Sequence, residues 1–434
     1  MTTVAITPIS KIFTKGKLVV SSRLFLSVGA QGLVSGFHFA LNLLLLRLVT
    51  PFDYGIFAFA FVLAMFASAI NNALISTPLT VYTPVIKDPS KRADQEAMFS
   101  TLNIMLFVLL VFGGMIYSDG ASLDSNISLA VTAFVAVYSA RHYSRSAGYA
   151  RMRPLITATG DSVYVAAGLL IVLTLLLTQD TPGITSILYA LATANLAAMI
   201  VERTLLHGNS RKWLSFGRLN SYGAVWLQSR WALIGSLTTL FLAQAHSVII
   251  TSTYGPNAYA PLAAGFVLFG PVRVALLTWQ NMVKPELAVA LSESREDAVR
   301  AQIKTTTLLM TGAVLAMGIF LWLAWPLIHK FLYAEQYADQ PMAYIVGLWS
   351  VITLFAASYN APAAALQAMR DFKVLAIASI YGAVISGVMV GLLLYYFNPE
   401  NTLLGILSAE VFMAIYLTHT LYSRLKTPPV QEAT

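Results

Sequence analysis

Long uncharged apolar segments recur along this sequence, and they constrain its fold more than any other feature. Segments 102–116, 163–178 and 376–397 contain no Asp, Glu, Lys or Arg. With its flanks, each approaches the roughly 20 residues that a helix needs to cross a bilayer. The chain is 57% hydrophobic and only 11% charged, so a soluble domain could not hide its apolar surface. A β-barrel would show short alternating segments instead. The sequence therefore predicts an all-α, polytopic membrane protein.

We expect twelve transmembrane helices. Their approximate ranges are 22–46, 54–84, 97–117, 127–148, 154–178, 184–206, 224–252, 257–284, 303–326, 341–367, 374–397 and 402–423. The segment 47–55 (RLVTPFDYG) is then the outer turn between the first two spans. Pro51 and Gly55 break the helix there because water, unlike lipid, can satisfy the freed backbone groups.

The positive charges predict the orientation of the chain. With the amino terminus in the cytoplasm, all but Arg47, Arg273 and Lys330 of the 27 lysines and arginines fall at cytoplasmic helix ends or loops. Cytoplasmic loops of membrane proteins carry such an excess of Lys and Arg. Both termini are therefore expected in the cytoplasm, and the net charge of +8 indicates a membrane surface rather than nucleic acid. The absence of cysteine excludes disulfides and thiolate metal sites.

The two halves of the chain resemble each other. Pro51 and Tyr54 recur as Pro256 and Tyr259, and the tripeptide at 61–63 (FVL) recurs at 266–268. The near-constant separation of these matches indicates two pseudo-symmetric six-helix lobes around a central cavity, which is a transporter architecture. We expect an amino-terminal lobe at 1–206, a basic cytoplasmic linker at 207–223 that lies along the membrane surface, and a carboxy-terminal lobe at 224–434.

The opening turn also resembles a known family. An Arg-Leu pair, a Pro-x-x-(Tyr/Phe)-Gly turn and a Phe/Ala-rich second helix are similar to the start of polysaccharide flippases. These are oligosaccharide-repeat-unit transporters of the multidrug/oligosaccharidyl-lipid/polysaccharide exporter superfamily. The residues that carry the resemblance are Arg47, Leu48, Pro51, Tyr54, Gly55 and Phe57. The short basic loops at 151–154 (RMRP) and 369–373 (MRDFK) are similar to those of the family too.

The resemblance implies alternating access and a polyprenyl-diphosphate-linked oligosaccharide as cargo, for exopolysaccharide, capsule or O-antigen synthesis. It implies a bacterial inner-membrane location. No P-loop, HExxH, nucleophile-elbow or cofactor motif appears, so the sequence does not support an ATP-driven pump or a hydrolase, and we do not expect an enzyme. We expect no cofactor and no metal, a monomer, and a polysaccharide polymerase and glycosyltransferases as protein partners.

Arg273 is the most informative intramembrane charge. It lies about 16 Å from the inner end of its span. A charge at that depth costs on the order of 3 kcal/mol unless it faces water or a partner. Arg273 either attracts the substrate diphosphate or pairs with a buried acid such as Glu410.

Four further arginines are candidate substrate ligands. Arg141 and Arg145 lie on one helix face with Tyr138, since the spacing is i, i+3, i+7. Arg23 and Arg230 begin equivalent helices and could form a basic gate, because arginine suits planar phosphate recognition. The alternative for each is an anchor at the inner membrane interface.

Other polar groups within the spans could bind sugar or a coupling ion. The sugar candidates are Asn71, Asn72, Gln280, Asn281, Tyr359 and Asn360. Asp161 and Glu410 could carry a coupling ion or serve as counter-charges for arginine. His38 and His246 lie at matching depths in the two halves and are either proton carriers or packed histidines.

Three rival functions remain open. A cation-coupled multidrug exporter would share the twelve-helix design but would need acids in its cavity. A glycan polymerase or ligase would need a large outer loop with paired basic residues, and the outer turns carry only Arg47 and Lys330 as bases. A non-transporting scaffold would have its interior packed shut.

Overall fold

The computed structural model describes residues 9–120, 124–179, 182–207, 214–293, 296–369 and 371–425. Within these ranges, the side chains of residues 9–25, 27, 28, 117–120, 207, 224, 228 and 296, and of several residues between 277 and 292, lie outside the description. Every regular element in the described part of the chain is a helix. The all-α prediction is confirmed.

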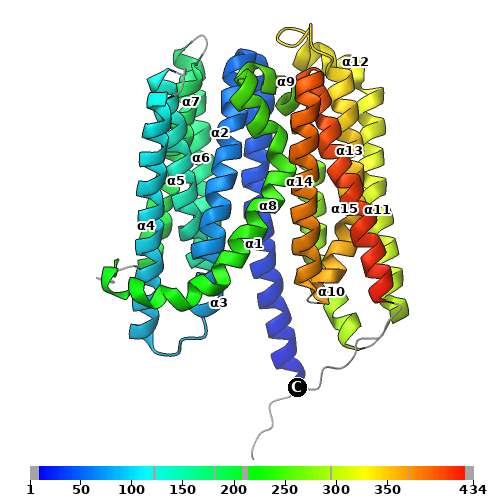
Figure 1. Cartoon of the computed structure of the whole chain (residues 1–434). Coiled ribbons are helices and arrows are strands. Elements are labelled where there is room, and N and C mark those ends of the chain that lie inside the picture. The colour runs from blue at the N-terminus through cyan, green and yellow to red at the C-terminus, as the bar shows by residue number, and fades with distance from the viewer. Residues whose placement is uncertain are drawn as a thin grey trace, which may run out of the picture.

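The helices form two groups that stand side by side (Figure 1). The amino-terminal lobe contains α1 (Ile9–Leu48), α2 (Pro51–Asn71), η1 (Asn72–Ser76), α3 (Thr77–Tyr82), α4 (Pro89–Gly120), α5 (Ser125–Ala150), α6 (Pro154–Thr178) and α7 (Ile184–His207). The carboxy-terminal lobe contains α8 (Tyr222–Tyr254), α9 (Pro256–Val267), α10 (Gly270–Ser292), α11 (Glu296–Leu323), α12 (Trp325–Ile328), η3 (His329–Tyr333), α13 (Met342–Ala368), α14 (Phe372–Tyr396), η4 (Pro399–Thr402) and α15 (Leu403–Arg424). The short helix η2 (Phe216–Ser221) precedes α8.

The structure accounts for the twelve predicted spans. In the described residues, ten helices are long and apolar enough to cross a membrane, and the pair α9 and α10 makes an eleventh span that bends by 58°. The remaining predicted span is α5, which is 26 residues long but carries Arg141, His142 and Arg145. It is therefore the most polar of the spans. Its arginines belong to a buried charge cluster that is described below.

The two equivalent outer turns, one in each lobe, have different local chemistry. Thr50 caps α2, because its hydroxyl accepts a hydrogen bond from the backbone N–H of Asp53, and Pro51 occupies the first helical position. At the equivalent place in the second lobe, Gly255 has φ of 84°, and no side chain caps α9. Glycine tolerates this left-handed backbone without a steric penalty.

The lobes are joined at one end, which we call the outer end because it holds the predicted outer turns. There α2 packs against α9 and α8. One hydrophobic cluster spans this junction and includes Phe57 from one lobe and Leu262 from the other. Toward the inner end the buried clusters separate, one around Met98 and Tyr143 and another around Leu287. Figure 1 shows the lobes diverging in the same direction.

Gly55 makes the junction close. A Cβ at Gly55 would overlap the carbonyl oxygen of Pro256 and would lie 3.1 Å from its Cα. Pro256 is the pseudo-symmetry equivalent of Pro51, so the two outer turns pack against each other. Gly55 lies inside α2 without a positive φ, so the expectation that it breaks the helix was wrong, and the contact between the lobes is what requires a glycine here.

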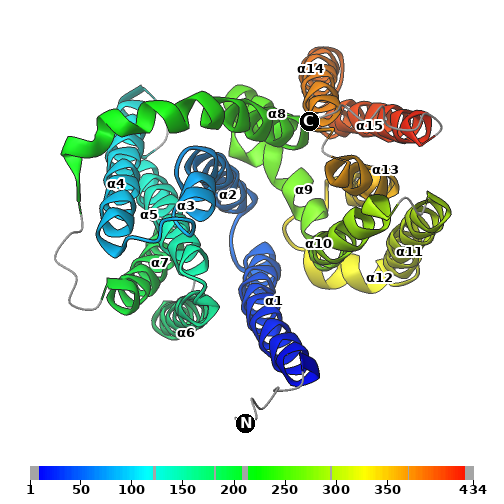
Figure 2. The ribbon, with the colours of Figure 1, turned by 90° about the horizontal axis from the view of Figure 1, so that it is seen from below.

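The start of α1 and the end of α15 both lie at the inner end of the bundle (Figure 1). The first turns of α8 run across this end of the amino-terminal lobe before the helix turns toward the outer end (Figures 1 and 2). Arg218 of η2 pairs with Asp94 at 2.6 Å, and the hydroxyl of Tyr222 donates to the carbonyl of Leu74. Residues 208–213 of the predicted linker lie outside the described residues, and its boundaries remain a prediction.

Candidate functional site

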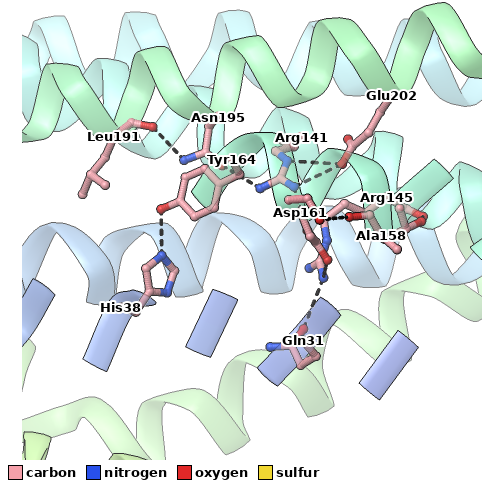
Figure 3. Close-up of polar contacts among 12 residues, drawn as sticks. Gln31, His38, Arg141, Arg145, Ala158, Asp161, Tyr164, Leu191, Asn195 and Glu202 are labelled. Carbon is pink, nitrogen blue, oxygen red and sulfur yellow. Dashed lines mark hydrogen bonds and ion pairs between the residues drawn. The ribbon is translucent and has the colours of Figure 1, made fainter. Parts of the chain in front are cut away.

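The amino-terminal lobe contains a buried charge cluster, formed by Arg141 and Arg145 of α5, Asp161 of α6, and Asn195 and Glu202 of α7 (Figure 3). Arg141 donates to Asp161 at 2.6 Å and to Glu202 at 3.1 Å. Its remaining terminal nitrogen donates to the amide oxygen of Asn195 at 3.3 Å. The side chain of Arg141 is only 5% exposed. Two like carboxylates can lie this close together because one guanidinium stabilises both.

A glycine in α6 allows Glu202 to reach the cluster. The carboxylate of Glu202 lies across Gly160, where an added Cβ would overlap its Oε1 atom. Glu202 itself is fully buried, and its Oε2 atom has no hydrogen-bond partner among the described residues. Close helix packing at a small residue thus brings an acid from α7 to a base on α5.

Arg145 links this cluster to α1. It donates to the second oxygen of Asp161 at 2.9 Å and to the side-chain oxygen of Gln31 at 3.2 Å. Its side chain remains 23% exposed. A second bond to α1, this one from α6, joins His38 to the hydroxyl of Tyr164 at 2.7 Å. Figure 3 shows these contacts extending from α7 across α5 and α6 to α1.

The pairing limits what Arg141 can do. We expected it either to attract substrate or to anchor a helix end, but its guanidinium is buried and already saturated by two carboxylates. The geometry therefore does not support a direct substrate contact, and Asp161 serves as a counter-charge for two arginines. A buried ion pair with one partner removed leaves an uncompensated charge, so these groups depend on one another.

The carboxy-terminal lobe holds a broken helix, formed by α9 and α10, at the place that corresponds to α2 in the first lobe. The span bends at Leu268 and Phe269, and α10 begins again at Gly270 in the middle of the chain's crossing. Arg273 lies in the first turn of α10, where its backbone N–H donates to the carbonyl of Phe269. Because the first backbone N–H groups of a helix carry partial positive charge, this break places two sources of positive potential together.

The side chain of Arg273 is exposed, unlike that of Arg141. Its guanidinium lies over the ring of Phe266, 4.2 Å from the ring centre. Glu410 and Tyr359 are its electrostatic neighbours, yet within the described residues it forms no ion pair at salt-bridge distance. The carboxylate of Glu410 lies beside Tyr359, and one of its buried oxygens has no partner among the residues that the structure describes. Arg273 is therefore a cation that can still accept an anionic ligand.

The other sequence-predicted residues are dispersed. Asn71 is fully buried and bonds to Asn103 at 2.7 Å, so it ties helices together and does not face a ligand. Asn72 is exposed, and its side chain accepts a bond from Thr77. Asn360 is half-buried and donates to the backbone of its own helix.

Arg230 and His246 each contact an aromatic ring of α8 or α13. Arg230 is exposed and lies over the ring of Trp231, at 5.5 Å, in the first part of α8. His246 is buried between Ser247 and Trp349, which corresponds to a packed histidine. The side chains of Arg23, Gln280 and Asn281 lie outside the described residues. Over the part of the chain that the structure describes, no three His, Asp or Glu side chains come together to hold a metal ion.

Sequence reasoning missed Glu202 and Gln31. A signal for Glu202 existed, because Asn195 and Glu202 are seven residues apart and therefore share one face of α7. Polar residues on one face of a membrane helix indicate a polar partner on a neighbouring helix. Nothing in the sequence identified that partner as Arg141.

Comparison with known proteins agrees with this architecture. No family model matches the chain. It has the fold of a multidrug resistance transporter of the MATE family, in the MOP superfamily, that was solved in an inward-facing conformation. The TM-score is 0.68 and the sequence identity 15%, and the alignment covers 93% of this chain and 94% of that one. It is also similar to the lipid II flippase MurJ in an inward-closed conformation, with a TM-score of 0.65, 14% identity and coverage of 94% of this chain and 88% of that one. An outward-facing MATE transporter aligns with a TM-score of 0.56 and 14% identity over 94% of each chain.

The molecule is therefore a multi-pass membrane protein with the fold of MOP-superfamily transporters. In sequence, it is 24% identical over 417 residues to the EPS I polysaccharide export inner membrane protein EpsE of Ralstonia nicotianae, covering 91% of this chain and 92% of the relative. The resemblance expected from the opening turn is confirmed by this similarity along almost the whole chain.

Proposed function

We propose that the chain is a flippase that moves a polyprenyl-diphosphate-linked oligosaccharide from the cytoplasmic to the periplasmic leaflet of a bacterial inner membrane. The observation that carries the proposal is Arg273, an exposed arginine that forms no ion pair with the residues that the structure describes and lies in the first turn of a helix that restarts within the span. A guanidinium binds phosphate oxygens through two parallel hydrogen bonds, which gives both energy and orientation.

The arrangement of the lobes supports alternating access. The lobes share a hydrophobic cluster at the outer end and have separate clusters toward the inner end, as an inward-facing transporter would. The higher TM-score against the inward-facing MATE structure agrees with that state. With both termini in the cytoplasm, Arg273 would be reached from the cytoplasmic side, where lipid-linked glycans are assembled.

The charge cluster of the first lobe does not bind the cargo in this proposal. Because Arg141 and Arg145 already hold Asp161, we assign the cluster to coupling between helices and not to the cargo. Asp161 and Glu410 remain the candidates for a coupling ion, and Glu202 joins them because one of its buried oxygens is unpartnered. A polysaccharide polymerase and glycosyltransferases remain the proposed partners.

The proposal is tested by transport in liposomes that contain the purified full-length protein. The substrate is a fluorescent oligosaccharide on a polyprenyl diphosphate, and a glycolipid with the same sugars and no phosphate is the comparison. Loss of a hydrogen bond to a charged group costs about 1.5–3 kcal/mol, so Arg273→Ala should slow transport roughly 10- to 150-fold. Arg273→Lys should give a transport rate between those of the parent and Arg273→Ala. Lysine keeps the positive charge but lacks the two parallel N–H donors of the guanidinium.

Lys330→Ala provides the matched control, because it removes an exposed base from the outer loop. The control should transport at the normal rate, and Arg273→Ala should keep its thermal stability because it breaks no ion pair. Normal transport by Arg273→Ala would contradict the proposed anion site. Export of lipophilic cations in place of the diphosphate substrate would favour the multidrug alternative.

A further inference from the structure

A polar pocket opens among three outer turns of the carboxy-terminal lobe. It has a volume of about 300 Å³. One wall comes from the junction of α8 and α9, a second from the segment that leads into α13, and a third from η4. Pockets that bind small ligands begin at about this size.

The lining combines flat apolar surfaces with unengaged polar groups. Pro261, Ile345 and Pro399 supply apolar surface, and the ring of Tyr254 adds an aromatic face. The polar side chains are those of Tyr254, Asn257, Gln340 and Glu400. In the described part of the chain, none of these four side chains makes a hydrogen bond or an ion pair with another residue.

This chemistry selects among ligand classes. No lysine or arginine lines the pocket, so it offers no charge partner to a phosphate. A single carboxylate is too few for a hard cation, which takes six or more oxygen ligands. Two amides, a phenol and a carboxylate offer both donors and acceptors, and the prolines and tyrosine offer faces for C–H groups. An uncharged sugar ring presents hydroxyls at its edge and C–H groups on its faces, and it fits both features.

The pocket exists because the duplicated turns have diverged. By the alignment of Pro51 with Pro256, the equivalent of Asn257 in the first lobe is Phe52, a large apolar side chain. The first turn is also closed by the bonds between Thr50 and Asp53. In the second lobe, Gly255 has a positive φ, and Tyr254 and Asn257 near it both line the pocket.

We propose that this pocket binds one uncharged sugar residue of the glycan at the outer face of the membrane. The proposal rests on the proposed function for the source of that glycan. Asn257 immediately follows Pro256, which packs against Gly55 where the lobes meet. A sugar held here lies beside the junction that must open for release. The pocket therefore serves as an exit site, separate from the anion site at Arg273.

Saccharide binding is measured by saturation-transfer NMR on the full-length protein in nanodiscs. The probes are the free oligosaccharide repeat of the host polysaccharide, without lipid or diphosphate, and glucose, galactose and N-acetylglucosamine as single sugars. Asn257→Phe installs the side chain of the first lobe and fills the pocket, so binding should be abolished. Glu400→Gln removes a charged acceptor and should weaken binding about tenfold or more.

Two matched controls change the same residue types outside the lining. Asn398→Phe and Glu335→Gln both lie at exposed outer positions and should bind saccharide as the parent does. Binding that survives Asn257→Phe, or an absence of saccharide binding to the parent protein, would overturn the pocket proposal.

The two proposals fail separately. If Asn257-dependent saccharide binding occurs while the diphosphate substrate is not transported, the pocket stands and the flippase proposal falls. If transport depends on Arg273 while saccharide binding is unchanged in Asn257→Phe and Glu400→Gln, the flippase proposal stands and the pocket proposal falls.

Discussion

Replacing Gly55 by alanine should open the outer junction between the lobes. The added Cβ would overlap the backbone carbonyl of Pro256, and backbone cannot rotate away as a flexible side chain would. Overpacking a well-packed contact costs about 1–3 kcal/mol. The penalty applies only to the state in which the two outer turns touch, so it should shift the equilibrium between outer-closed and outer-open states about 5- to 150-fold.

The shift can be measured as a distance distribution between spin labels at the outer ends of the lobes. The natural chain has no cysteine, so a pair of cysteines can be introduced without other changes. Phe52 on α2 and Phe397 after α14 are suitable positions, since they are 40% and 60% exposed. Gly55→Ala should raise the population of the longer distance in the absence of substrate.

Gly347→Ala is the matched control, because a Cβ at Gly347 meets nothing within 4 Å. It should leave the distance distribution unchanged. The reasoning is refuted if Gly55→Ala leaves the same distribution as the control while the protein remains folded. Such a result would mean that the contact with Pro256 relaxes locally and does not hold the outer end closed.

Three further predictions concern the amino-terminal lobe. Arg141→Leu should destabilise the protein by about 3–5 kcal/mol, measured by chemical unfolding in detergent, because buried Glu202 loses its counter-charge and Asp161 keeps only Arg145. Adding Glu202→Leu should recover part of the loss, and equal stability of the single and double variants would contradict this. Gly160→Ala should displace the carboxylate of Glu202 and cost about 1–3 kcal/mol in the same assay, whereas an unchanged midpoint would show that the cluster adapts. Asn71→Leu should cost about 1–3 kcal/mol by leaving Asn103 unsatisfied, with unchanged sugar selectivity in transport; altered selectivity would restore the sugar-binding interpretation of this residue.

Much of the fold was predictable because lipid restricts the choices. A backbone in hydrocarbon must satisfy its own hydrogen bonds, so long apolar segments can only be helices. The number of spans followed from segment length, even for α5, whose charges lower its hydropathy. The duplication followed from paired motifs such as Pro51 and Pro256, because each proline begins the second helix of its own lobe.

The roles of the individual charges were much less predictable. Arg141 and Arg273 are both intramembrane arginines, and in sequence each was compatible with a ligand or a counter-charge. The partners of Arg141 are 20 and 61 residues away, on two other helices. No local periodicity identifies such partners, since they depend on which helix faces pack together.

The sequence by itself determined that this is a helical membrane protein of two related halves, because composition and periodicity act through the solvent around each segment. Tertiary structure alone decided that Arg141 is neutralised while Arg273 stays available, and that one of two related outer turns leaves a polar pocket. Burial and pairing are properties of neighbours in space, and here those neighbours come from helices far apart in the chain.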